Sequence, residues 1–243
     1  MDGAAVKELA TRFRGPEVID GFISVPQDWQ LHDPASLVKA APAAKAMPVS
    51  TLKSLVDYVK ANRDGLALDK VLVHIESPTR VTIGGPLRDR SRDRELYLTA
   101  IAIDMAEPFL GKWLSTEDFI IGLQLRFVAD NQSRALLRLL SNVSGETVST
   151  SMDDGISQVL ETRAGVVLKG STPIQNPLAL APFRTFREVD QPVSPFVLRA
   201  KSGSDLPLLT LLEADGGAWR LAAIEHIRAY LAKELPAEVA LLA

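Results

Sequence analysis

Hydrophobic positions recur every three to four residues in several segments, which is the spacing of a helix with one buried face. The helices predicted from this spacing cover residues 3–14, 50–62, 115–127, 131–141 and 218–235. Two of their ends carry clear signals, because Ser115 is followed three residues later by Asp118 and Pro236 ends the last helix. The last helix is amphipathic, with a predicted buried stripe of Leu221, Ile224, Ile227 and Leu231.

Alternation of apolar and polar residues predicts strands between these helices. They cover residues 17–25, 71–83 (with a break at Ser77-Pro78), 95–104, 146–151, 156–168, 178–188, 195–201, 206–213 and 239–242. Two pairs of consecutive strands are predicted to form long hairpins. Residues 71–83 pair with 95–104, and residues 146–151 pair with 156–168. The second hairpin has its turn at Asp153-Asp154-Gly155.

Strands therefore come in antiparallel runs, and helices are inserted between the runs. This order predicts an α+β fold: an antiparallel sheet with long hairpins, inserted helices and a C-terminal amphipathic helix. No strong linker divides the chain, so we expect a single domain over residues 1–243. Residues 26–49 are rich in Pro, Ala and Lys and are predicted to be irregular, either wrapping over a neighbouring subunit or crossing the domain surface.

The composition is that of a globular protein, with 47% hydrophobic and 23% charged residues in 243. No cysteine is present, which excludes disulfides, thiol nucleophiles and thiolate metal sites and suits a reducing cytoplasm. The net charge is −3, whereas proteins that bind duplex nucleic acid through its phosphates usually carry an excess of basic residues. No run approaches the ~20 apolar residues of a membrane-spanning helix, so we expect no membrane partner.

Residue types that carry catalysis do not occur here in a recognisable pattern. His32, His74 and His226 are not spaced as metal ligands. The acidic residues Asp153, Asp154 and Asp215 precede glycines, where turn chemistry explains them. We therefore predict no catalytic residue, no metal ligand and no cofactor.

The most distinctive charged stretch is the loop of the first hairpin, where arginines alternate with acids. Its arginines are Arg88, Arg90, Arg92 and Arg94, and Arg80 lies just upstream. Guanidinium groups bind phosphate through two parallel hydrogen bonds, so these five residues are the candidate ligand- or phosphate-binding residues. The intervening acids nearly neutralise the stretch, and the favoured interpretation is a solvated or subunit-pairing loop.

A second set of arginines lies beside aromatic residues in the C-terminal third. It comprises Arg184, Arg187 and Arg199 with Phe183, Phe186 and Phe196. Such a set can stack bases and bind phosphates. Phe183 and Phe186 are an odd number of residues apart and cannot share one face of a regular strand, so we expect Phe183 and Phe196 in the core and the arginines in solvent.

The segments Val49 to Val59, Ser115 to Phe119 and Pro182 to Val189, in this order, are similar to an uncharacterised family of tailed-phage and prophage proteins that includes the YfdQ-like proteins. The similarity covers residues 48 to 235. It implies a phage-encoded protein that works in the cytoplasm of the bacterial host cell. It implies no active-site residues.

The leading hypothesis is therefore a phage- or prophage-encoded accessory protein that acts by binding, as a homo-oligomer. Its partner is either nucleic acid, in replication or recombination, or a small phosphorylated ligand, in counter-defence. One alternative is a metal-dependent hydrolase of nucleotides or nucleic acid, which requires carboxylates from distant segments to converge. Another is a structural component of the virion.

Overall fold

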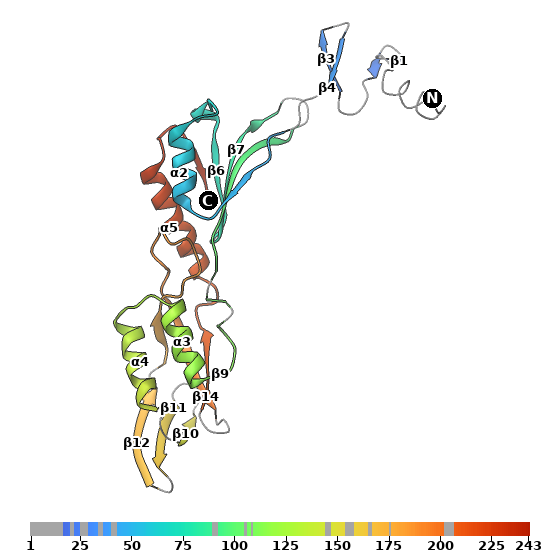
Figure 1. The fold of residues 1–243 in the computed structure, drawn as a ribbon. Coiled ribbons are helices and arrows are strands. Elements are labelled where there is room, and N and C mark those ends of the chain that lie inside the picture. The colour runs from blue at the N-terminus through green and yellow to red at the C-terminus, as the bar shows by residue number, and fades with distance from the viewer. Residues whose placement is uncertain are drawn as a thin grey trace, which may run out of the picture. The chain divides into compact units, whose positions relative to one another are not determined.

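The computed structural model describes most of the chain beyond residue 42 and several strands before it (Figure 1). The described ranges are 17–19, 22–24, 29–33, 36–39, 43–88, 92–104, 106–107, 109–143, 147–153, 158–164, 167–174, 176–201 and 207–243. The chain forms two compact units, residues 1–44 and 45–243, and each is described by itself.

The N-terminal unit contains two short antiparallel hairpins. β1 (Glu17–Ile19) pairs with β2 (Phe22–Ser24), and β3 (Trp29–Asp33) pairs with β4 (Ser36–Lys39). The strand predicted over 17–25 is thus two strands, and the segment 26–49 that was predicted to be irregular contains β3, β4 and part of a sheet described next. The helix predicted over 3–14 lies outside the described residues.

The first sheet of the larger unit has five strands in the order β16-β6-β7-β8-β5. Their bounds are Met47–Val49 for β5, Leu72–Ser77 for β6, Arg80–Leu87 for β7, Arg94–Ile101 for β8 and Ala240–Leu242 for β16. β7 and β8 form the predicted hairpin. The single strand predicted over 71–83 is two strands, because the chain reverses at the predicted break and β6 pairs antiparallel with β7. Both edge strands are parallel to their neighbours, so the sheet is mixed and not purely antiparallel as predicted.

Two helices, α2 (Leu52–Ala61) and α5 (Trp219–Glu234), pack on one face of this sheet (Figure 1). Thr51, one residue after the predicted Ser50, is the N-cap of α2, and a 3₁₀ turn follows the helix at Leu68–Lys70. α5 buries Ala223, Ile227 and Leu231. Leu221 was predicted in this stripe but is 72% exposed, because it lies two residues, about 200° around the helix, from Ala223.

The second sheet is antiparallel, in the order β13-β14-β15-β9. Its strands are β9 (Leu114–Ser115), β13 (Leu178–Leu180), β14 (Ser194–Lys201) and β15 (Leu208–Glu213). The helices α3 (Thr116–Arg126) and α4 (Asn131–Val143) pack against each other and contribute to its core. The predicted start of α3 is confirmed, because the Ser115 hydroxyl accepts a hydrogen bond from the amide of Asp118.

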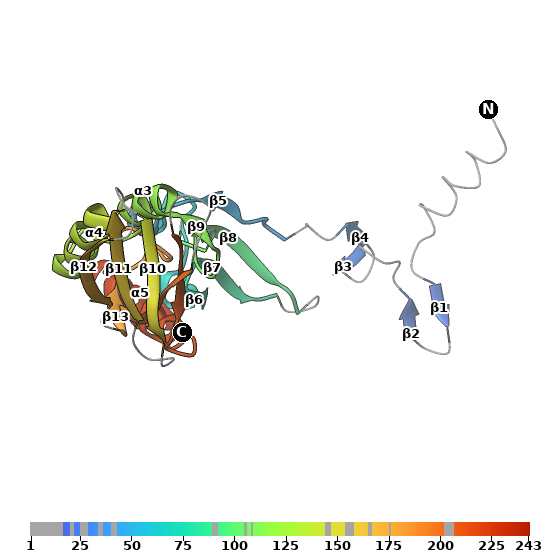
Figure 2. The ribbon, with the colours of Figure 1, turned by 90° about the horizontal axis from the view of Figure 1, so that it is seen from below.

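A third sheet contains β10 (Thr147–Asp153), β11 (Gln158–Ala164) and β12 (Val167–Ile174), side by side and antiparallel (Figure 2). The hairpin predicted over 146–168 is therefore confirmed, with a third strand added. Helices and largely antiparallel sheets together establish the α+β class. None of the helices in the described part of the chain is both long and apolar enough to cross a bilayer.

Candidate functional site

Three connections lie between the first and second sheets. Residues 102–113 run from β8 to β9 and residues 214–218 run from β15 to α5, whereas the middle connection, residues 181–193, leaves the second sheet after β13 and returns to it at β14. The middle connection joins the two hydrophobic cores. Phe186 and Val189 are buried in the core of the first sheet, whereas Phe196, just beyond the connection, is buried in the core of the second. The residues between these anchors are consequently held at the junction of the two sheets.

The side chain of Gln191 holds this connection in an irregular conformation. Its Oε1 accepts hydrogen bonds from the amides of Arg184 (3.0 Å) and Thr185 (3.2 Å), and its Nε2 donates to the carbonyl of Phe186 (2.9 Å). These are bonds that a neighbouring strand would otherwise supply. The strand predicted over 178–188 ends at Leu180, and the next residues bond to the backbone of Arg126 and Val128 before Gln191 takes over at Arg184.

Arg184 is the central residue of the junction and is only 2% exposed. Its guanidinium donates hydrogen bonds to Glu213 and Ser194 and lies 4.0 Å from the centre of the Trp219 ring. Burial lowers the pKa of Arg184, while the bond to Glu213 opposes that shift. An arginine stays protonated under such conditions, so a positive charge is fixed between the sheets.

Asp215 connects this network to the start of α5. Its carboxylate accepts hydrogen bonds from the Ser194 hydroxyl (2.6 Å) and from the amides of Gly217 (2.8 Å) and Trp219 (3.2 Å). Burial alone would raise the pKa of Asp215, but these three bonds and the attraction of Arg184 outweigh it and hold the pKa below its usual range. The same carboxylate thus fixes the first turn of α5 and the buried arginine.

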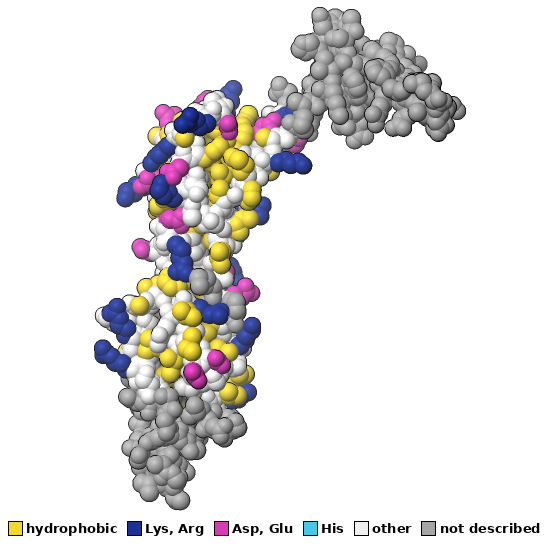
Figure 3. Space-filling view, viewed as in Figure 1, with side chains coloured by type: hydrophobic (Ala, Val, Ile, Leu, Met, Phe, Trp, Pro, Cys, Tyr) yellow, Lys and Arg dark blue, Asp and Glu magenta, His cyan; other side chains and the backbone are white. Residues whose placement is uncertain are grey.

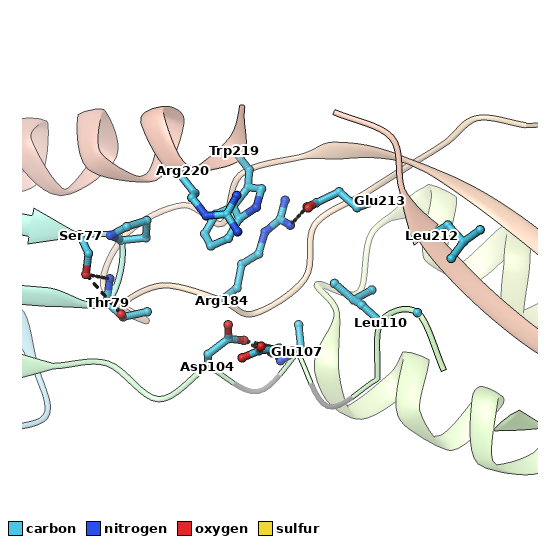
Figure 4. Close-up of a pocket in the computed structure, with 13 residues that line it drawn as sticks. Ser77, Thr79, Asp104, Glu107, Leu110, Arg184, Leu212, Glu213, Trp219 and Arg220 are labelled. Carbon is cyan, nitrogen blue, oxygen red and sulfur yellow. Dashed lines mark hydrogen bonds and ion pairs between the residues drawn. The ribbon is translucent and has the colours of Figure 1, made fainter. Parts of the chain in front are cut away.

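A cleft of about 590 Å³ opens at this junction (Figure 4). Trp219 and Arg220 lie on one side of it, Asp104 and Glu107 lie on the other, and Arg184 lies between them. Pro78, Leu110 and Leu212 add apolar surface, and the remaining lining residues are Ser77, Thr79, Ala106, Gly111 and Glu213. The cleft therefore has a cationic side, an anionic side and an apolar surface.

The charged groups of the cleft are only partly used by the protein itself. Oδ1 of Asp104 accepts hydrogen bonds from the amides of Ala106 (2.9 Å) and Glu107 (3.2 Å). The exposed guanidinium of Arg220 lies 4.9 Å from the centre of the Trp219 ring. Arg184 Nε and Trp219 Nε1 are buried donors with no hydrogen-bond partner among the described residues. The cleft can thus bind a ligand that carries both an anionic group and hydrogen-bond donors.

Arg80, Arg88, Arg92 and Arg94, which were predicted as ligand-binding residues, are not among the described residues that line this cleft. Arg80 forms an ion pair with Glu76 at 2.8 Å. Arg88 lies 3.4 Å from Glu95 and 3.9 Å from Asp93. These two arginines therefore pair with acids of their own hairpins.

Arg92 and Arg94 lie near the tip of the hairpin formed by β7 and β8. Arg94 Nη1 donates to the carbonyl of Gly85 at 2.8 Å. Arg92 is exposed and has a φ of 58°, the left-handed region that suits a tight turn. Arg90 lies outside the described residues. The role of this set in ligand binding stays a prediction.

The second set of arginines is arranged differently from the expectation. Phe196 is buried as predicted, but Arg184 was expected in solvent and is instead the most enclosed charge of the junction. Phe183 is half-buried, with the Arg187 guanidinium 3.6 Å from its ring centre. The turn at Asp215 was predicted, but nothing in the sequence indicated that Trp219, just beyond that turn, stacks on the Arg184 guanidinium.

Over the ranges described above, no three histidine, aspartate or glutamate side chains converge as metal ligands. Comparisons of the chain with protein-family models, curated proteins and solved structures give no match. The candidate site is accordingly defined by its geometry and charges.

Proposed function

We propose that the chain is a phage- or prophage-encoded binding protein of the bacterial cytoplasm that holds a small phosphorylated ligand in the junction cleft. The observation that carries this proposal is the arrangement of Arg220 opposite Asp104 and Glu107 in a cleft of about 590 Å³. Small-molecule sites typically measure roughly 300–1,000 Å³. The phage origin rests on the family resemblance of the sequence.

Each side of the cleft matches a part of such a ligand. The Arg220 guanidinium is a forked donor suited to a phosphate group. The carboxylates of Asp104 and Glu107 accept hydrogen bonds from hydroxyl or amino groups. Pro78 and Leu110 offer apolar contact to a ring. A nucleotide carries all three kinds of group, so we infer a nucleotide or a related phosphorylated metabolite as the ligand.

Two buried donors give the cleft a further reason to bind a group rich in acceptors. A buried donor without an acceptor costs about 1–3 kcal/mol. Arg184 Nε and Trp219 Nε1 are such donors in the wall of the cleft, judged against the part of the chain that is described. A ligand oxygen that reached these donors would satisfy them and would favour the bound state.

A small ligand is favoured over nucleic acid, the other partner considered. The net charge is −3, and Arg80, Arg88 and Arg94 already have acceptors within the chain. A polynucleotide needs a run of uncommitted cations along its backbone. The cleft instead offers one exposed cation beside acceptors, which suits one or two phosphates.

The test is isothermal titration calorimetry of the purified protein, after the 260/280 nm absorbance ratio has shown whether a nucleotide co-purifies. The titrants are nucleoside mono-, di- and triphosphates, inorganic phosphate and a single-stranded 20-mer. We expect a nucleotide to bind and Arg220→Ala to weaken its binding at least about tenfold, the value of one charge-assisted hydrogen bond. Arg228→Ala, an exposed arginine of the same helix, is the control and should bind as the parent protein does.

Three results would contradict the proposal. They are no binding of any nucleotide, equal affinity of the Arg220→Ala protein, or binding of the 20-mer alone with loss of affinity on changing the hairpin arginines. The last result would move the site to Arg80, Arg88, Arg92 and Arg94.

A further inference from the structure

We propose that two copies of the chain associate through α3, packed antiparallel about a two-fold axis near Gly122. The helix has apolar residues on two faces. Phe119 and Leu123 face the core of the second sheet and are buried. Ile121 and Leu125, four residues apart, lie on another face and are 48% and 61% exposed. Apolar side chains gather over α3 in the space-filling view (Figure 3).

The exposed apolar residues border a groove that runs along the helix. The groove measures about 270 Å³. It is lined by Phe109, Leu114, Asp118, Ile121, Gly122, Leu125 and Arg126. A side chain at Gly122 would collide with the Phe109 ring, so the floor of the groove is closely packed and already formed. An apolar side chain entering from outside therefore meets a rigid surface.

The charges at the two ends of this groove identify the occupant. Asp118 lies in the first turn of α3 and Arg126 in the last. They are eight residues apart, about 12 Å along the axis at ~1.5 Å per residue. An antiparallel second copy places its own Arg126 beside Asp118 and its own Asp118 beside Arg126. Ile121 and Leu125 of the two copies then interleave between the two ion pairs.

This surface is self-complementary, which is the property that a two-fold symmetric interface requires. A different protein could match the apolar stripe, but the opposite charges placed symmetrically about the middle of the helix fit a second α3. Among the described residues, none lines both this surface and the junction cleft. Ligand binding and self-association can therefore succeed or fail independently.

The first test is the mass of the full chain by light scattering after size exclusion and by sedimentation velocity, over 1–100 µM. We expect a dimer for the parent protein and a monomer for Leu125→Glu. Leu221→Glu is the matched control, because Leu221 is also exposed on a helix (72%), and it should leave the dimer intact. A monomeric parent protein would overturn the proposal, and so would a dimeric Leu125→Glu protein.

The second test exchanges the charges. Asp118→Arg and Arg126→Asp each place like charges together in a homodimer, so each variant alone should be monomeric. A mixture of the two variants restores both opposite-charge pairs and should form a heterodimer. Dimers of either variant alone, or a mixture of two folded variants that stays monomeric, would overturn the antiparallel arrangement. Circular dichroism shows that each variant is folded, and the Leu125→Glu comparison decides the proposal if Asp118→Arg does not fold.

Discussion

A charge buried as deeply as Arg184 is tolerated only while its hydrogen-bond partners stay in place. Glu213 and Ser194 bond its guanidinium directly, and Asp215 holds Ser194 and attracts the arginine. A single arginine in a sequence carries no sign of such a set, because its partners come from residues 10 to 31 positions away. For that reason the sequence predicts Arg184 in solvent, although the turn that contains Asp215 is predicted correctly.

The depressed pKa of Asp215 leads to a pH-dependent stability. Replacing Asp215 with Ala removes the acceptor of the Ser194, Gly217 and Trp219 hydrogen bonds, and we expect a loss of about 1 kcal/mol at pH 7, as for a lost helix cap. The folded pKa lies below the unfolded value of about 3.9, so the ionised carboxylate stabilises the protein fully above that pH. This contribution disappears as the pH falls through the folded pKa.

The stability difference between the parent protein and Asp215→Ala should therefore narrow from pH 7 to pH 3. Urea unfolding at the two pH values measures it. Asp69→Ala, an acid in a short 3₁₀ turn with no side-chain hydrogen bond among the described residues, is the control and should show a smaller difference at pH 7. A difference for Asp215→Ala that is constant with pH would contradict the role given to its ionised form.

At the scale of elements, the features that depend on residues close together in the chain were predicted correctly. The Ser115 cap, the β7–β8 hairpin and the hairpin of β10 and β11 depend on residues close together in the chain, and all are found. The parallel pairing of β5 with β8 and of β16 with β6 was missed. Each edge strand is only three residues long, and its direction depends on where a distant part of the chain returns to the sheet. The early end of β13 was missed because the backbone partners of the next residues, Arg126 and Val128, are distant in sequence, and from Arg184 onward the side chain of Gln191 replaces a partner strand.

α3 allows a prediction in which packing opposes helix propensity. A glycine-to-alanine change inside a helix normally stabilises by up to about 1 kcal/mol. At Gly122 the added Cβ collides with the ring of Phe109, which is 2% exposed and cannot move aside freely. We expect Gly122→Ala to destabilise the protein by about 1–3 kcal/mol, the usual range for overpacking.

Chemical denaturation of Gly122→Ala, Phe109→Leu and the double variant measures this effect. Leucine is smaller than the phenylalanine ring and leaves room for the added Cβ. The double variant should therefore lose less unfolding free energy than the sum of the losses of the two single variants. Additive losses of unfolding free energy would show that Phe109 does not constrain Gly122. A Gly122→Ala protein more stable than the parent would show that the helix propensity of alanine outweighs the collision.

At the scale of the whole molecule, the α+β class followed from the order of elements, whereas the junction cleft did not. The cleft is lined by the turn between β6 and β7, by the 102–113 and 181–193 connections, and by the end of β15 and the start of α5. Its lining residues range from Ser77 to Arg220, so only the assembled fold brings them together. The predicted arginine loop was conspicuous because its charges are adjacent, and adjacency in sequence also lets them pair with one another.

The junction also bears on how residues 45–243 unfold. Phe186 is 1% exposed in the core of the first sheet, and two residues earlier Arg184 is bonded to Ser194 of β14 and Glu213 of β15. Loss of the first core should therefore release the connection and weaken the second sheet. We expect Phe186→Ala, which removes about 3–5 kcal/mol of packing, to lower hydrogen-exchange protection in both β7 and β14. Phe119→Ala, in the second core, is the reciprocal variant and should lower protection in the same two strands. If each variant affects only its own sheet, the two cores unfold independently and Arg184 is not the connection between them.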